Sequence, residues 1–96
     1  MSTPQPSIDK YESRRIRVAI RHVLLKVWDP IGVKDMPSAQ DEYDAYLGDI
    51  YELLISKAPD SKILEYLYWV AHEGMGLEPE HAKTEAAIRA LREIRN

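Results

Sequence analysis

Hydrophobic residues recur at helical spacing in four separate stretches of this chain. The first stretch runs from about Ser7 to Trp28, and its apolar positions repeat every three or four residues. That period is typical of an amphipathic helix with one buried face. Pro30 is expected to end this helix, because the residue before a proline is kept out of the α-helical region. The apolar stripe consists of Ile16, Ile20, Val23, Leu24, Val27 and Trp28.

The second stretch is expected to begin at Ser38. Ser38-x-x-Asp41 resembles a capping box, in which side chains bond the free N–H groups of a first helical turn. The acidic residues that follow suit the positive end of the helix dipole. Pro59 marks the end of the stretch. Its stripe consists of Tyr43, Tyr46, Leu47, Ile50, Tyr51, Leu54 and Ile55.

The last two stretches follow after short connections. The third helix is expected to run from Asp60, as its N-cap, to Gly74. Gly74 or Gly76 would end it, with Leu77 folding back on the last turn. The fourth helix is expected to start at Pro79, since proline is favoured as a first helical residue. The third stripe consists of Ile63, Leu64, Leu67, Val70 and Ala71, with Tyr66 and Trp69 on its flanks, and the fourth of Thr84, Ala87, Ile88, Leu91 and Ile94.

These patterns predict an all-α fold. No stretch alternates in the manner of a β-strand, and no segment repeats. We expect a small bundle of four helices, mostly antiparallel, with an ordered Asp-Pro-x-Gly connection between the first two. Residues 1–7 have neither the basic nor the apolar region of a secretory signal, and we interpret them as a disordered lead-in. Residues 8–96 are expected to form a single domain.

The connection after the first helix has the most unusual composition. It reads Trp28-Asp29-Pro30-Ile31-Gly32-Val33, followed by Asp41-Glu42-Tyr43-Asp44 and by Tyr46. We interpret Trp28, Asp29, Pro30 and Gly32 as a structural motif. Trp28 is expected to be a core anchor that packs against the second or third helix. Asp29 is expected to accept hydrogen bonds from backbone N–H groups within residues 30–34, as aspartates at turns commonly do.

With these residues the chain resembles a family of small, uncharacterised bacterial helical proteins that share a WDPIG…DEYD signature. Met75-Gly76-Leu77 adds to the resemblance, which covers roughly residues 20–77. The resemblance implies a compact helical fold in a bacterial cytoplasm, and it brings no catalytic residue that can be assigned here. The lack of cysteine and of any long apolar run fits a cytoplasmic protein without a membrane span.

Charge is distributed unevenly along the chain, although the net charge is only -3. Residues 1–28 carry six Lys and Arg against two acids, whereas residues 29–60 carry eight acids against two Lys. Such segregation bears on the choice of partner. We predict a partner face for a basic protein, formed by Asp41, Glu42, Tyr43, Asp44 and Tyr46. Nucleic acid is not expected, because the chain is acidic and no aromatic platform lies among the arginines of the first helix.

Candidate catalytic groups do not form a recognisable set. The acids of the region 29–49 lack the alternating spacing of a calcium loop, and the three histidines lack the spacing of a zinc helix. We therefore expect no metal and no cofactor. The serines and glycines match no nucleophile or phosphate-binding motif. An enzyme of hydrolase type would have to use Asp29 or Asp44 with His81 as acid and base.

The sequence favours a non-enzymatic protein-interaction domain with an acidic, tyrosine-bearing face. One version would be an immunity- or antitoxin-like protein that blocks a basic effector by electrostatic complementarity. Two alternatives stay open at this point. One is a small-molecule or metal-binding module built on the region 29–49, and the other is the hydrolase-type enzyme.

Overall fold

The computed structural model describes residues 10–94, which form four α-helices and no strand. This confirms the predicted all-α bundle; the predicted lead-in, residues 1–7, lies outside the described residues. The helices are α1 (Lys10–Val23), α2 (Leu47–Ile55), α3 (Asp60–Trp69) and α4 (His81–Arg92). A π-helical turn prolongs α1 over Leu24–Trp28 (η1) and another prolongs α3 over Val70–Gly74 (η4). Two short 3-10 turns, η2 (Pro37–Ala39) and η3 (Asp44–Tyr46), lie in the connection before α2.

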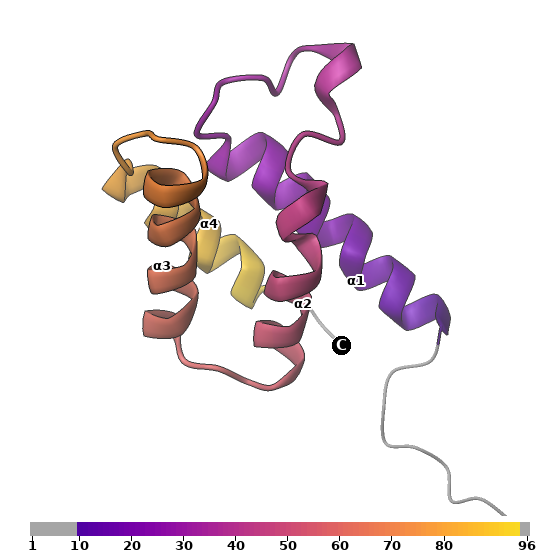
Figure 1. Cartoon of the computed structure of the whole chain (residues 1–96). Helices are drawn as coiled ribbons and strands as arrows, with labels where there is room; N and C mark the ends of the chain where they lie inside the picture. Colours follow the sequence, from indigo (N-terminus) through magenta and orange to yellow (C-terminus); the bar gives the residue numbers. More distant parts are fainter. Residues whose placement is uncertain (1–9, 95–96) are drawn as a thin grey trace, which may run out of the picture.

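The helices pack around one core (Figure 1). Helices α2 and α3 stand side by side and antiparallel, α4 passes behind them, and α1 lies along the other side of α2. The first turns of α1 extend beyond the rest of the bundle. None of the helices between residues 10 and 94 is both long and apolar enough to cross a membrane.

The core consists of the predicted stripes. The fully buried side chains come from all four helices and from both π-helical turns, so each helix contributes one face, as an amphipathic period requires. They include Ile16, Ile20, Leu24, Trp28, Ile50, Ile63, Leu67, Val70, Thr84 and Leu91. Stripe residues at the edges, such as Val27 and Leu54, are half-buried and pack against this core.

The predicted start of the second helix at Ser38 is wrong, because α2 begins only at Leu47. Ser38 makes no capping bond, and Pro37–Ala39 is a single 3-10 turn. Between residues 36 and 46, several backbone N–H groups donate to the carbonyl oxygen three residues earlier. Glu42 donates to Ala39 in this way, and Tyr46 to Tyr43. Bonds of this kind make tight turns rather than an α-helix. The chain turns because Tyr43 must reach back to the end of η1, as described below.

Two other helix starts differ from the prediction by one or two residues. Pro59, not Asp60, is the N-cap of α3, and the Asp60 carboxylate instead accepts from Arg92 Nε at 2.5 Å. Helix α4 starts at His81, two residues after Pro79, with Glu80 as an extended N-cap. At the other end of α3, the predicted helix end at Gly74 or Gly76 is confirmed. Gly76 adopts a left-handed conformation (φ 67°), and Leu77 N–H folds back to the Ala71 carbonyl at 2.8 Å.

Trp28 is a core residue, as predicted, with only 2% of its surface exposed. Its ring packs on that of Tyr43, a member of the predicted second stripe, with centroids 5.5 Å apart, and Ala71 of η4 lines the same small pocket. The turn that carries it, η1, packs against α4. Trp28 thus joins the end of α1, the long connection, η4 and α4.

We predict that Trp28→Ala lowers the free energy of unfolding by about 3–5 kcal/mol, because it removes a buried indole and leaves a cavity. Urea unfolding monitored by circular dichroism would measure the loss. Trp69→Ala is the matched control, since Trp69 is 59% exposed and its truncation should cost less than about 1 kcal/mol. Equal losses for the two variants would contradict the core assignment of Trp28.

Candidate functional site

The Asp29 carboxylate is the centre of the Asp-Pro-x-Gly connection. Asp29 is 5% exposed and adopts a left-handed backbone conformation (φ 33°, ψ 60°) at the end of η1. Its Oδ1 accepts from the N–H groups of Gly32 (3.1 Å) and Val33 (2.8 Å), and its Oδ2 from that of Lys34 (3.1 Å). The prediction that Asp29 braces residues 30–34 is confirmed.

These bonds keep Asp29 ionised. Burial by itself raises the pKa of the Asp29 carboxyl, but bonds from three backbone N–H groups and from the Tyr43 hydroxyl outweigh it, so the pKa lies below its ordinary value. Both oxygens are occupied by donors from the chain itself. A carboxylate held in this way acts as a structural brace of the connection.

Tyr43 belongs to the core, which corrects its predicted place on a partner face. Only 3% of its surface is exposed. Its hydroxyl donates to Asp29 Oδ1 (2.8 Å) and accepts from the Ile31 N–H (3.0 Å). Burial, together with the neighbouring Asp29 carboxylate, raises the pKa of the Tyr43 phenol well above its ordinary value, so the hydroxyl keeps its proton.

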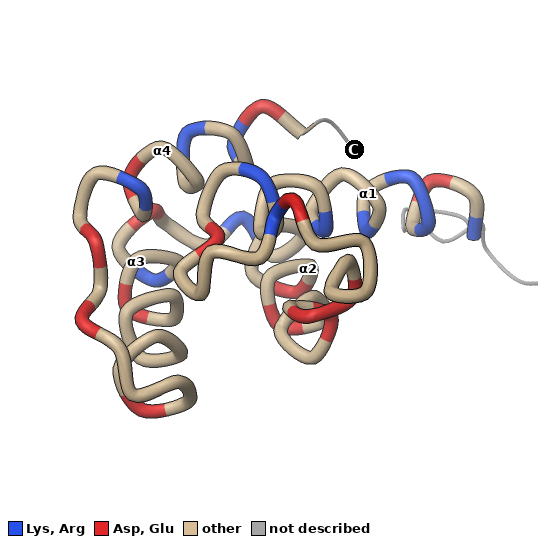
Figure 2. The backbone as a smooth tube through the Cα atoms, turned by 90° about the horizontal axis from the view of Figure 1, so that it is seen from above, with Lys and Arg blue, Asp and Glu red and all other residues tan. Residues whose placement is uncertain are grey.

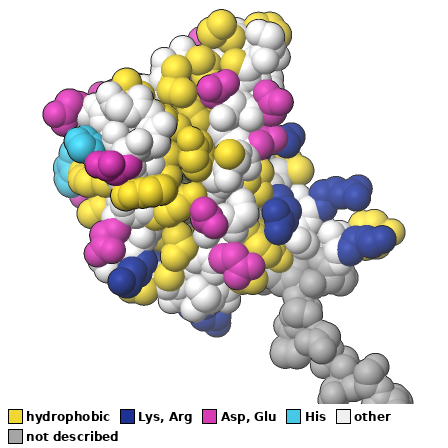
Figure 3. All heavy atoms as spheres, viewed as in Figure 1, with side chains coloured by type: hydrophobic (Ala, Val, Ile, Leu, Met, Phe, Trp, Pro, Cys, Tyr) yellow, Lys and Arg dark blue, Asp and Glu magenta, His cyan; other side chains and the backbone are white. Residues whose placement is uncertain are grey.

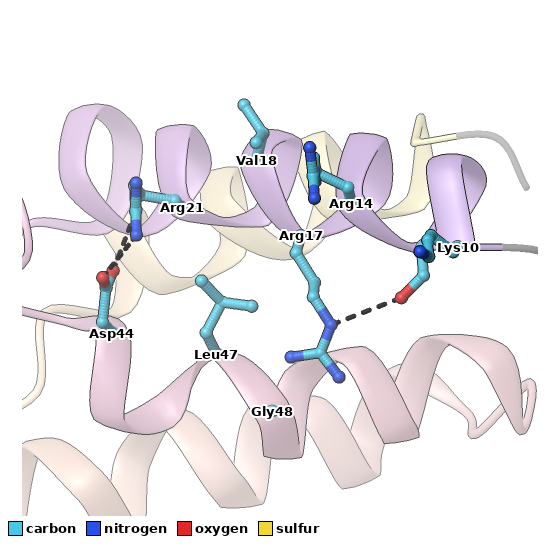
Figure 4. Close-up of a pocket in the computed structure, with 9 residues that line it drawn as sticks. Lys10, Arg14, Arg17, Val18, Arg21, Asp44, Leu47 and Gly48 are labelled. Atoms are coloured by element: carbon cyan, nitrogen blue, oxygen red, sulfur yellow. Dashed lines mark hydrogen bonds and ion pairs between the residues drawn. The ribbon is translucent and has the colours of Figure 1, made fainter.

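The other residues of the predicted partner face have different surroundings. Asp41 and Glu42 are exposed on the connection. Asp44 is taken up by a two-bond ion pair with Arg21, with N–O distances of 2.9 and 2.5 Å (Figure 4). Tyr46 is half-buried, and its hydroxyl lies beside Gly74 at the end of η4. The segment therefore does not present two tyrosines and three free carboxylates together.

Acidic and aromatic side chains lie together in the groove between α2 and α3. It has a volume of about 690 Å³. In the space-filling view a hydrophobic band follows this groove, with acidic side chains beside it (Figure 3). The groove residues are Asp49, Glu52, Leu53 and Ser56 from α2, and Lys62, Glu65, Tyr66 and Trp69 from α3.

Two aromatic rings form the apolar part of this groove. Tyr66 and Trp69 stack with their centroids 6.4 Å apart and their planes at 29°. The Tyr66 hydroxyl donates to Asp49 Oδ2 at 2.7 Å, which ties α3 to α2. Burial and this bond raise the pKa of the Tyr66 phenol, so it remains a donor and fixes the ring. Trp69 stacks on a fixed platform while most of its surface stays in contact with solvent.

This groove was missed by the sequence analysis, although one signal pointed to it. Tyr66 and Trp69 lie outside the apolar stripe of the third helix, three residues apart, where a soluble bundle needs no large aromatic. Asp49 and Glu52 are likewise three residues apart and lie outside the apolar stripe of the second helix. What the spacing could not show is that α2 and α3 turn these two faces toward each other.

Positive charge gathers on the other side of α2, along α1 (Figure 2). A hollow of about 590 Å³ lies there, lined by Lys10, Arg14, Arg17 and Arg21, with Asp44 as its one acid. The Arg17 guanidinium sits 4.4 Å from the centre of the Tyr51 ring, and its Nε donates to Ser13 Oγ at 3.4 Å. In Figure 4, Val18 points away from α2, whereas Arg14 lies along α1.

The histidines do not assemble the acid–base pair considered from the sequence. His81 Nδ1 lies 2.7 Å from the Tyr68 hydroxyl, and its Nε2 lies 3.1 Å from Glu85, on the surface of α3 and α4. Asp29 and Asp44 have other partners. Within residues 10–94 no three His, Asp or Glu residues are grouped to hold a metal ion.

No family model, no curated protein and no solved structure matches this chain. The resemblance to proteins with a WDPIG…DEYD signature therefore stays a prediction. The structure does give both parts of that signature one physical role. Asp29 from the first part and Tyr43 from the second are bonded to each other, so the two segments form a single brace.

We predict that Tyr43→Phe lowers the free energy of unfolding by about 1–2 kcal/mol, because it leaves the Ile31 N–H and one Asp29 lone pair without the hydroxyl. The ring would still pack on Trp28. Urea unfolding measures the loss, and Tyr46→Phe serves as control because its hydroxyl takes no part in the brace. A Tyr43→Phe protein as stable as the wild type would show that the hydroxyl does not support the fold.

We predict that Asp29→Asn removes an acid-sensitive part of the stability. The folded-state pKa of Asp29 is depressed, so its contribution is present above the ordinary pKa of about 3.9 and is lost as the pH falls through the folded value. The gap in unfolding free energy between wild type and variant should therefore narrow from about pH 6 to about pH 2.5. Urea unfolding across this range would show it. Asp35→Asn, an exposed position in the same connection, should follow the wild-type profile, and a constant gap for Asp29→Asn would refute the prediction.

Proposed function

We propose that this protein is a protein-interaction domain whose α2–α3 groove binds a basic amphipathic helix of a partner. The observation that carries the proposal is Trp69. It is an indole on a fixed platform, 59% exposed, beside three carboxylates. Tryptophan and tyrosine are the residues that most often dominate binding energy at interfaces.

The shape of the groove suits a helix. Side chains from α2 and from α3, two antiparallel helices, line a shallow groove that is largely open to solvent, and a hydrophobic band follows it (Figure 3). An amphipathic helix lays apolar residues spaced three or four apart into such a groove. Leu53 and the Tyr66–Trp69 pair offer the apolar contacts, and their positions are already fixed by packing, so little side-chain entropy is lost on binding.

The charge of the groove selects a basic partner. Asp49, Glu52 and Glu65 lie along it, against one basic residue, Lys62. Complementary charge speeds the encounter of two proteins and disfavours partners of like charge. A basic effector blocked by an immunity- or antitoxin-like protein would be one partner of this kind.

We predict that Trp69→Ala weakens the binding of a basic helical peptide at least tenfold without unfolding the domain. The probes would be synthetic peptides with leucines three and four residues apart, flanked by lysines, and the same peptides with glutamates in place of the lysines. Isothermal titration gives the affinity, and the indole N–H signal of Trp69 in NMR reports the site. Met36→Ala, another exposed apolar residue away from the groove, is the control.

The charge part of the proposal has its own variant pair. Glu52→Lys with Glu65→Lys should slow association with the basic peptides, and added salt should reduce the difference, since the Debye length is about 8 Å at physiological ionic strength. Glu78→Lys with Glu93→Lys changes the same charge elsewhere on the exposed surface. The groove is not the interaction site if no basic peptide shifts the Trp69 signal. The same holds if the two double variants associate with the basic peptides at equal rates.

A further inference from the structure

We propose that α1 of a second copy of this chain occupies the α2–α3 groove, so that the protein associates with itself head to tail. The inference rests on the proposed function of the groove as a site for basic helices. It names one such helix, which is carried by the chain itself. The argument comes from the outer face of α1, from the charges of the two surfaces and from the place of α1 in its own bundle.

The outer face of α1 has the composition that the groove requires. Its inner face holds the buried residues Ile16, Ile20 and Val23. On the opposite side Tyr11 is 77% and Val18 58% exposed, seven residues apart, which is the spacing of anchors along one helix face. Arg14 borders this apolar pair on one side, next to Arg21, whose guanidinium is held by Asp44. Arg15, which is paired with Glu12, and His22 lie on the other side. Helix α1 is therefore a basic amphipathic helix with an unburied apolar stripe.

The groove and the outer face of α1 are both partly apolar, and their charges are opposite. The groove offers Trp69 and Leu53 beside carboxylates, and α1 offers Tyr11 and Val18 beside the exposed Arg14. Pairing α1 with α1 would bring arginines together, and pairing two grooves would bring carboxylates together. Like charges at that distance oppose association, so the unlike pairing is favoured.

Helix α1 cannot fill the groove of its own chain. It packs on the side of α2 that carries Leu47 and Gly48, whereas the groove uses the side with Asp49, Glu52 and Leu53. Reaching the groove would require pulling Ile16 and Ile20 out of the core. The extension of the first turns of α1 beyond the bundle makes them accessible to another copy instead (Figure 1).

A contact between two different surfaces has a distinct consequence for assembly. Each copy keeps one unused groove and one unused helix after the first contact, so association continues into chains or closes into a ring. One helix in an open groove buries less area than a standard interface of about 1,600 Å², so the association is expected to be weak. It would compete with a partner for the groove.

The test uses two variants that each lose one surface. Trp69→Ala with Glu52→Lys disables the groove, and Val18→Asp with Arg14→Glu disables the outer face of α1. All four side chains are exposed, and circular dichroism would confirm that both variants keep the fold. The wild type should show a weight-average mass that rises with concentration, up to about 1 mM, in sedimentation equilibrium. Each variant alone should remain a monomer.

Mixing the two variants is the decisive measurement. The groove variant still has an intact α1 and the helix variant an intact groove, so the mixture should form a one-to-one heterodimer that grows no further. Added salt should dissociate it. A wild type that stays monomeric, or a mixture without heterodimer, would overturn the self-association. If the wild type nevertheless bound basic peptides through Trp69, the proposed function would stand, whereas loss of both activities would remove both proposals.

Discussion

One buried carboxylate fixes the connection that leads from α1 to α2. Asp29 ends the π-helical turn of α1 in a left-handed conformation, and its two oxygens accept three backbone N–H bonds and the Tyr43 hydroxyl. A buried charge is tolerated only when it is fully hydrogen-bonded, and here every bond comes from the connection itself. The connection is therefore ordered without a regular helix. Because the Tyr43 ring also packs on Trp28, the same brace closes one end of the core.

The position of α2 follows from this brace. The chain must return Tyr43 to Asp29 before a helix can start, so α2 begins at Leu47 rather than at the favourable sequence signal of Ser38. Helix α2 then stands between α1 and α3 and keeps both apart (Figure 1). One of its sides meets the arginines of α1, and the other meets Tyr66 and Trp69 of α3.

This division separates the charges of the surface. The ion pair between Arg21 and Asp44 and the stacking of Arg17 on Tyr51 attach the basic side of α1 to α2. The acids of the groove remain on the far side of α2, next to an indole that the core does not need. A small domain with two oppositely charged, partly apolar surfaces has the means to bind a basic helix and also to offer one. Both proposals use this separation, and competition for one groove would link them.

The sequence by itself determined that there are four helices, which faces they bury and the role of Asp29, but not where the second helix begins. Periodicity and turn chemistry are local properties, so the stripes from Ile16 to Leu91, the termination at Gly76 and the bonds from residues 32–34 could all be predicted. Only the tertiary structure decided which aromatic is buried. Tyr43 and Trp69 look alike as members or neighbours of a stripe, yet a bond to a residue fourteen positions away buries the first, and the pairing of α2 with α3 leaves the second in solvent. Such contacts depend on how distant segments meet, and a local pattern of residues does not encode that meeting.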